Sequence, residues 1–126
     1  MKYSKATNYA LHVVQLIYKN GDEEAMSVSK IAGELQVAPS YLSKILATLV
    51  KQGILEAVSG VNGGYRINAS HDKITMLDVI HAIEGSQSMF DCDPKHGPNC
   101  TIYQKMKESE TQMEAFLSSI YISDLV

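Results

Sequence analysis

The 126-residue sequence lacks a long hydrophobic run, an excess of positive charge and a cysteine-rich framework. No apolar stretch approaches the roughly 18–20 residues that a membrane-spanning helix needs. The pattern of a signal peptide is also missing, because polar residues interrupt the first apolar segment at Lys2, Lys5, Asn8 and His12. We therefore expect a cytoplasmic protein with no membrane partner, whose two cysteines do not form a structural disulfide.

The stretch from Ala38 to Arg66 carries the clearest pattern in the chain. Its first half predicts a helix that starts at Pro39, since the missing N–H of proline has no partner in a first turn. Gly53 is suited to end this helix. An apolar stripe recurs at helical spacing and consists of Leu42, Ile45, Leu46, Leu49 and Val50. The side chains on the other side are small or basic: Ser40, Ser43, Lys44, Ala47 and Lys51.

Two short runs, 54–58 and 64–68, follow this helix around a Ser-Gly-Val-Asn-Gly turn. Asn62 and Gly63 tolerate positive φ, so the pattern predicts a β-hairpin. A helix with small and lysine side chains outward, followed by a glycine-rich hairpin, is the layout of a winged helix-turn-helix. Small side chains let such a helix approach base edges in the major groove, while lysines meet phosphates. An α+β domain without DNA-binding function gives the same periodicity, so both interpretations stand at this point.

The residues before this stretch predict the two helices that a helix-turn-helix requires. Residues 4–19 form an amphipathic segment that ends at Asn20 and Gly21. Residues 28–35 form a shorter segment, for which Ser27 is suited as the N-cap, and a three-residue turn then follows. The second helix is rich in small residues, which lets the third helix cross it closely: Ser29, Ala32 and Gly33.

Charge is distributed unevenly along the chain, whose net charge is −3. Residues 1–66 carry seven Lys and Arg against five Asp and Glu, whereas residues 67–126 carry four against nine. At the start of the first helix, Lys2, Ser4 and Lys5 face either solvent or a phosphate, toward which the helix amino terminus adds partial positive charge. The modest basic excess predicts few phosphate contacts and strong salt sensitivity.

The carboxy-terminal part predicts two further helices. Thr75 and Gly85 bracket one over 76–84, and residues 101–120 predict a long one. The long helix has a narrow heptad stripe, typical of a helix that pairs with another helix. We interpret its apolar members as a dimer interface, with packing on the chain's own domain as the alternative: Ile102, Met106, Met113, Phe116 and Ile120.

The expected fold is mainly α with a small β-hairpin. It comprises a winged helix-turn-helix domain over 1–85, a cysteine-containing sensor loop over 86–100, and a long C-terminal dimerisation helix with a tail over 101–126.

Several motifs occur in an order and spacing that identify a family: S-K-I-A-G-E-L, S-Y-L-S-K-I-L-A-T-L, G-V-N-G-G-Y-R-I and I-T-M-L-D-V-I-H-A-I-E-G. The sequence resembles the Rrf-two (Rrf2) family of bacterial winged-helix transcription regulators from about Met1 to Gly85, and in layout only beyond that. Known members include an iron–sulfur assembly regulator, a nitric-oxide-sensing repressor and a cysteine-metabolism repressor. The resemblance implies a homodimer, not an enzyme, that binds a dyad-symmetric operator and represses or activates transcription.

The resemblance also implies DNA contacts at particular positions. On the recognition helix and in the wing they are Ser40, Tyr41, Ser43, Lys44, Ser59, Asn62, Gly63 and Gly64, and Lys2, Ser4, Lys5 and Ser29 complete the expected set. Many relatives have an acidic residue in place of Ser43 and glutamine in place of Lys44, so a different base preference is expected. The ring of Tyr41 either contacts DNA or packs between helices with its hydroxyl on a phosphate.

The wing departs from the family pattern. Many relatives place an arginine that enters the minor groove where Ser59 stands, so Asn62 is the nearest substitute here. Gly63 and Gly64 still allow the backbone to approach DNA closely.

Both cysteines, Cys92 and Cys100, lie in the loop of residues 86–100, with His96 midway between them. Iron–sulfur members of the family carry three cysteines in this region, so we expect no cluster and no other cofactor here. Three interpretations stay open. They are a thiol sensor that uses both cysteines, a zinc site that adds His96 and Asp93, and a loop with two ordinary thiols.

The prediction is a sequence-specific, DNA-binding transcription regulator, a homodimeric repressor for which thiol response through Cys92 and Cys100 is one open interpretation. One rival is a protein-interaction winged helix that docks a partner on the Ala47 side of the third helix, where a large apolar anchor is missing. Another is a thiol enzyme that uses a cysteine with His96. No second orienting group and no glycine-rich oxyanion motif accompany that pair.

Overall fold

Helices account for most of the structure, a computed structural model that describes residues 3–21, 24–86, 88, 90, 94–97 and 99–126. Over these residues the order is α1 (Lys5–Asn20), α2 (Val28–Leu35), α3 (Pro39–Lys51), β1 (Leu55–Val58), β2 (Gly64–Ile67), α4 (Met76–Glu84), η1 (Pro94–His96), α5 (Thr101–Ser118) and η2 (Ile122–Leu125). The prediction of a mainly α fold with a small hairpin is confirmed. The 3₁₀ segment η1 lies within the predicted loop 86–100.

Local capping residues explain where these helices begin. The hydroxyl of Ser27 accepts a hydrogen bond from the backbone N–H of Lys30, as predicted for the start of α2. Thr75 and Asp78 form a reciprocal capping box at the start of α4, in which each side chain accepts from the other's backbone N–H. The first helix begins one residue later than predicted because Ser4 is its cap rather than its first residue.

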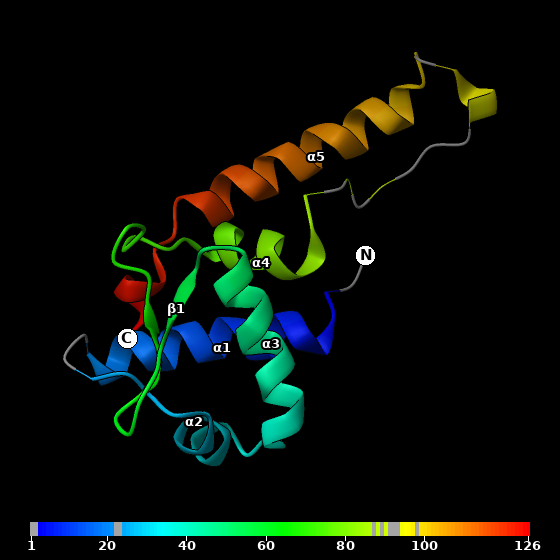
Figure 1. The fold of residues 1–126 in the computed structure, drawn as a ribbon. Coiled ribbons are helices and arrows are strands. Elements are labelled where there is room, and N and C mark those ends of the chain that lie inside the picture. Colours follow the sequence, from blue (N-terminus) through cyan, green and yellow to red (C-terminus); the bar gives the residue numbers. More distant parts are fainter. Residues whose placement is uncertain (1–2, 22–23, 87, 89, 91–93, 98) are drawn as a thin grey trace.

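The core is built from the apolar stripes of α1 to α4, the hairpin and the end of the chain. α3 crosses in front of α1, and α2 packs beside both (Figure 1). Fully buried side chains include Val13, Ile31, Leu42, Leu46, Leu49, Leu55, Ile74, Val79 and Ile122. The predicted stripe of α3 is buried except for Val50, which is half-buried, as are Ala6 and Leu35 at the edge of the core.

The hairpin is antiparallel, with Leu55 opposite Ile67 and Val58 opposite Gly64. Its strands are slightly shorter than the predicted runs 54–58 and 64–68. A third segment supports it, because Met26 and Tyr65 exchange two backbone hydrogen bonds of 2.9 and 2.8 Å. The wing is therefore fastened to the residue that precedes the cap of α2.

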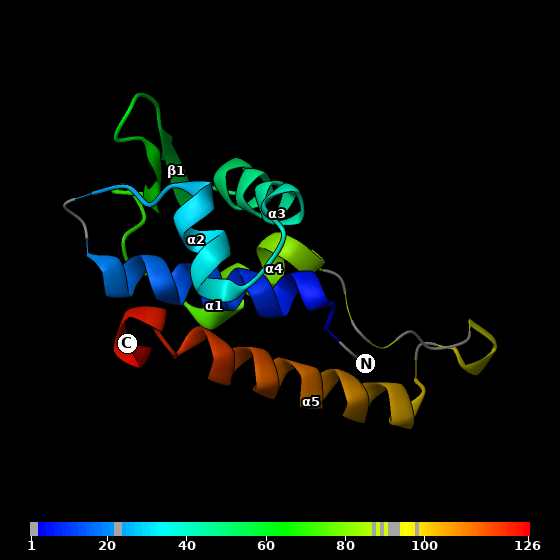
Figure 2. The same cartoon turned by 90° about the horizontal axis from the view of Figure 1, so that it is seen from below.

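α5 ends at Ser118, two residues before the predicted end. The chain then returns to the domain, where Thr75 and Tyr121 form a β-bridge and Ile122 is buried in the common core. Along α5 itself, Glu110 is the buried residue among those described. Seen from below, α3 and the hairpin lie on one side of α1 and α5 lies on the other (Figure 2). No helix of the described residues has the length and hydropathy of a membrane span.

Candidate nucleic-acid interface

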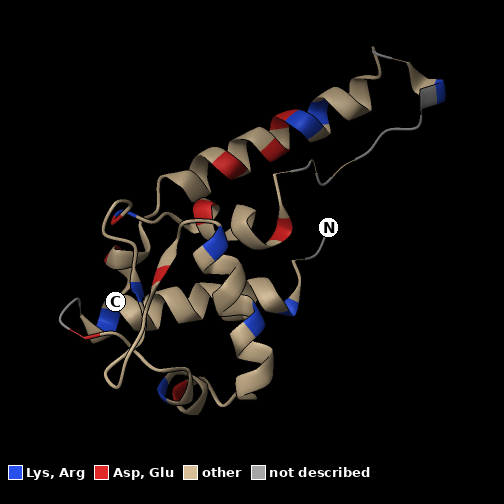
Figure 3. Ribbon diagram, viewed as in Figure 1, with Lys and Arg blue, Asp and Glu red and all other residues tan. Residues whose placement is uncertain are grey.

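The outward face of α3 is small and basic, as the sequence predicts. The exposed residues of this helix are Pro39, Ser40, Tyr41, Ser43, Lys44, Ala47 and Lys51. The helix carries basic and no acidic positions, whereas acidic residues gather along α4 and α5 (Figure 3). Among the described residues, the ammonium groups of Lys44 and Lys51 have no ion-pair partner. Both are therefore available to a phosphate.

Tyr41 has two environments at once. Its ring meets the ring of Tyr9 on α1 edge to face, with centroids 5.8 Å apart and planes at 80°. It still exposes 39% of its surface. Packing between helices and access to a ligand, the two alternatives from the sequence, are thus compatible. Tyr9 supports this contact and was not singled out from the sequence, because no spacing rule pairs residues so far apart.

Ser43 donates its hydroxyl proton to the carbonyl oxygen of Pro39, one turn earlier, at 2.9 Å. The hydroxyl oxygen of Ser43 keeps its lone pairs free to accept a hydrogen bond from a ligand. In this rotamer Ser43 therefore acts as an acceptor toward DNA, which suits an exposed amino group on a base edge. Ser29, on α2, is exposed as well.

The wing tip carries no cation. Ser59, Gly60, Val61 and Asn62 are exposed, and Val61 is fully so at 103%. Arg66, farther down the hairpin, is neutralised by Glu56 across the strands, with Nε and Oε1 2.6 Å apart. The wing therefore offers shape and amide groups to a ligand rather than charge.

Backbone contacts within the protein require glycine at two positions of the wing. A Cβ on Gly64 would lie 2.1 Å from the carbonyl oxygen of Met26, and one on Gly63 would lie 2.2 Å from that of Val58. Real Cβ atoms do not approach a backbone oxygen so closely. Close approach of DNA to these glycines, expected from the resemblance, stays a prediction.

The start of α1 is occupied by contacts within the protein. Ser4 caps the helix through its hydroxyl, and its backbone N–H donates to Oε2 of Glu84 at 2.7 Å. The hydroxyl of Thr7 donates to the same oxygen at 2.8 Å. These donors, the Ser4 N–H first, lower the pKa of Glu84. Lys5 is exposed, whereas Lys2 lies outside the described residues. Phosphate contacts by Ser4 and Lys5 stay predictions.

Burial raises the pKa of Tyr3, and the negative charges of Glu84, Glu114 and Glu110 raise it further. Glu84 belongs to α4, and Glu110 and Glu114 belong to α5. Negative charge gathers at this end of α1.

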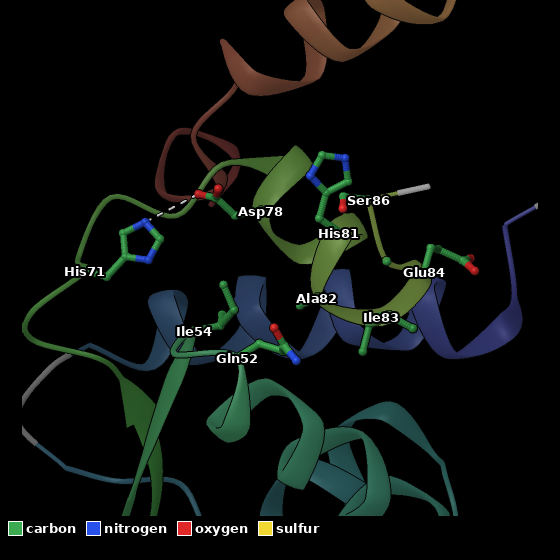
Figure 4. Close-up of a pocket in the computed structure, with 10 residues that line it drawn as sticks. Gln52, Ile54, His71, Asp78, His81, Ala82, Ile83, Glu84 and Ser86 are labelled. Atoms are coloured by element: carbon green, nitrogen blue, oxygen red, sulfur yellow. Dashed lines mark ion pairs between the residues drawn. The ribbon is translucent and has the colours of Figure 1, made fainter. Parts of the chain in front are cut away.

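A pocket of about 600 Å³ lies behind the end of α3. Figure 4 shows His71 and Asp78 at one end, where Nε2 and Oδ2 are 3.5 Å apart, and His81 with Ser86 at the other. Gln52 of the segment after α3 lines it too. Its acidic groups already have partners in the protein, so nothing identifies a ligand.

The predicted interface stripe on α5 is partly uncovered. Ile102 and Phe116 expose 69% and 64% of their surface, and Met106, Met113 and Ile120 are half-buried. Cys100 occupies the N-cap position of α5 and is half-buried, whereas Cys92 and Asp93 lie outside the described residues. The described residues contain no group of three or more His, Cys, Asp and Glu suited to a metal ion.

A helical core, an exposed third helix with small and basic side chains, and a hairpin fastened beside it define a winged helix-turn-helix protein. The Rrf2 family model, described as an iron-dependent transcriptional regulator, matches residues 3–126. The chain therefore belongs to the Rrf2 family of transcription regulators, which are not enzymes. The match extends through the carboxy-terminal third, where the sequence motifs showed a resemblance in layout only.

Individual relatives agree with this assignment. The transcriptional regulator NsrR of Geobacillus kaustophilus is 30% identical over 81% of this chain and 69% of its own length. The solved structure of T. potens IscR is 27% identical with a TM-score of 0.74, covering 99% of this chain and 85% of that one. CymR, the global cysteine regulator of B. subtilis, is 26% identical with a TM-score of 0.70 and covers 99% and 95%.

Proposed function

We propose that the chain is a homodimeric repressor that binds a dyad-symmetric operator, with one α3 in each of two major grooves. The observation that carries this proposal is the exposed face of α3, where small side chains lie beside two lysines that have no ion-pair partner among the described residues. The face suits close approach to bases, with Ser40 and Ser43 toward base edges and Lys44 toward a phosphate. The rival protein-docking role needs a large apolar anchor, and the partly packed Tyr41 is the one large apolar side chain exposed on this helix.

The dimer forms through α5. The single chain leaves the apolar stripe of α5 partly exposed. The helix α5 lies on the opposite side of α1 from α3 and the hairpin (Figure 2). Pairing of two α5 helices therefore leaves both DNA-facing sides uncovered. The two operator half-sites are then expected to lie one turn of the DNA helix apart, roughly 34 Å, or a small multiple of that distance.

The family description names iron dependence, but the residues of this chain do not fit an iron–sulfur cluster. Clusters are held by Cys thiolates, and the whole sequence has two cysteines. The half-buried Cys100 is the one cysteine among the described residues, and no group of His, Cys, Asp and Glu of cluster size surrounds it there. We propose thiol chemistry at Cys92 and Cys100 as the signal: an oxidant such as a peroxide takes two electrons and two protons from the two thiols, is itself reduced, and leaves a disulfide that would shift the loop before α5.

Selection of bound duplexes from a random pool tests the DNA-binding proposal. The expected result is a palindromic consensus that wild-type protein binds with steep salt dependence. A pool that stays without consensus would refute specific binding. Reporter transcription from the selected operator, with and without the protein, then distinguishes repression from activation.

The thiol proposal has its own test. Operator affinity of wild type, Cys92→Ser and Cys100→Ser is measured with and without diamide. A response in wild type that both variants lack supports a disulfide switch. Equal responses in all three proteins would refute the disulfide switch. Metal analysis of anaerobically purified protein then distinguishes free thiols from a zinc site.

A further inference from the structure

The carboxylate of Glu84 joins the end of α4 to the start of α1, at residues 80 and 77 positions earlier in the sequence. Oε2 of Glu84, the last residue of α4, accepts from the backbone N–H of Ser4 at 2.7 Å and from the hydroxyl of Thr7 at 2.8 Å. Figure 4 shows the side chain of Glu84 pointing away from the pocket, toward the first residues of α1. We call this set of two hydrogen bonds the Glu84 clamp.

The clamp joins a charged, exposed acceptor to a buried hydroxyl donor. Its acceptor is charged, which makes both hydrogen bonds stronger than neutral ones. The amino end of α1 adds partial positive charge next to the carboxylate. Thr7 is buried, with 1% of its surface exposed. Removing Glu84 would therefore take the nearest acceptor away from a buried hydroxyl, which costs free energy. Among the described residues, no lysine or arginine pairs with Glu84.

The clamp acts on a segment that is expected to meet DNA. Ser4 and Thr7 set the first turn of α1, which carries the exposed Lys5. On the other side, Glu84 is followed by Gly85, whose φ of 84° ends α4. The first turn of α1 thus takes its position from the end of α4 rather than from its own helix alone.

We propose that Glu84 is a positioning residue for DNA binding, which holds the first turn of α1 so that Lys5 faces the DNA backbone. This inference rests on the proposed function. Glu84 itself does not touch DNA, and its negative charge disfavours a nearby phosphate. A positioning role and a simple charge effect therefore predict opposite signs when the carboxylate is removed.

The test compares operator affinity of full-length variants by fluorescence anisotropy. Glu84→Ala and Thr7→Val remove the clamp from its two sides and are expected to weaken binding about five- to tenfold. Thr7→Ser keeps the hydroxyl and should restore wild-type affinity. Glu84→Gln keeps an acceptor oxygen and should weaken binding less than Glu84→Ala. Glu108→Gln, which removes an exposed charge on α5, is the control and should have no effect.

Amide hydrogen exchange provides a second measurement on the same proteins. In Glu84→Ala and Thr7→Val, exchange should become faster in the first turn of α1 and stay unchanged in α3. Higher affinity of both Glu84 variants with no effect of Thr7→Val would show a charge effect alone and overturn the inference. Unchanged exchange in the first turn of α1 would overturn it as well. If the wild type selects no operator, the proposed function fails first.

Discussion

Replacing Phe116 by alanine tests dimerisation through α5. In the single chain Phe116 is 64% exposed, so about two thirds of its surface remains for a partner. Full burial of such a side chain contributes about 1.5–3 kcal/mol, so covering the exposed part accounts for about 1–2 kcal/mol. A two-fold interface uses the residue twice. The dimer is therefore expected to weaken by about 2–4 kcal/mol, or roughly 30- to 1,000-fold in Kd.

Sedimentation equilibrium over a range of protein concentrations measures this change. Lys107→Ala is the matched control, because Lys107 is exposed on the same helix about half a turn away from the stripe. Ile102→Ala, at a position 69% exposed, should weaken the dimer in the same direction. Operator binding at low protein concentration should fall together with the dimer.

Thermal unfolding separates this effect from misfolding. A largely exposed side chain contributes little to the fold of one chain, so the variant monomer should retain its helical content. A dimer constant for Phe116→Ala equal to that of Lys107→Ala would refute the assignment of α5 as the interface. The exposed stripe would then need another occupant.

Three further predictions concern the wing, the recognition helix and the clamp. Lys44→Ala should weaken operator binding and lower the slope of log K against log salt by about 1, and an unchanged slope would exclude a phosphate contact. Gly64→Ala should cost about 2 kcal/mol or more of unfolding free energy in urea, because its Cβ would lie 2.1 Å from the Met26 carbonyl oxygen; wild-type stability would mean that the hairpin relaxes freely. Since the pKa of Glu84 is lowered from 4.5 in the folded protein, its contribution to stability is complete above about pH 4.5 and is lost as the pH falls through the lowered pKa. As the pH decreases, the free energy of unfolding should therefore fall more steeply for the wild type than for Glu84→Gln. An equal pH dependence of the two proteins would contradict the clamp.

The helix boundaries could be predicted from the sequence because they depend on local chemistry. Ser27 and Thr75 satisfy backbone N–H groups within three residues of themselves, and Gly85 ends its helix at a φ that favours glycine. The stripe of α3 follows from helical periodicity in the same way. Motifs within the first two thirds of the chain were enough to identify the family.

The contacts that shape the candidate site could not be predicted in this way. Glu84 with Thr7, Tyr9 with Tyr41, and Met26 with Tyr65 are pairs that are far apart in the sequence. No periodicity brings such residues together, because their proximity depends on how the helices cross. The same reason explains why the close contact between Gly64 and the Met26 carbonyl oxygen could not be predicted from the local sequence.

The sequence by itself determined the helices, the hairpin and the small, basic face of α3, since caps, turns and helical spacing act over a few residues. Tertiary structure alone decided that the start of α1 is held by α4, that the wing is fastened to Met26, and that the end of the chain enters the core at Ile122. These features arise from packing between distant segments, where the position of one element is set by the shape and hydrogen-bonding groups of another.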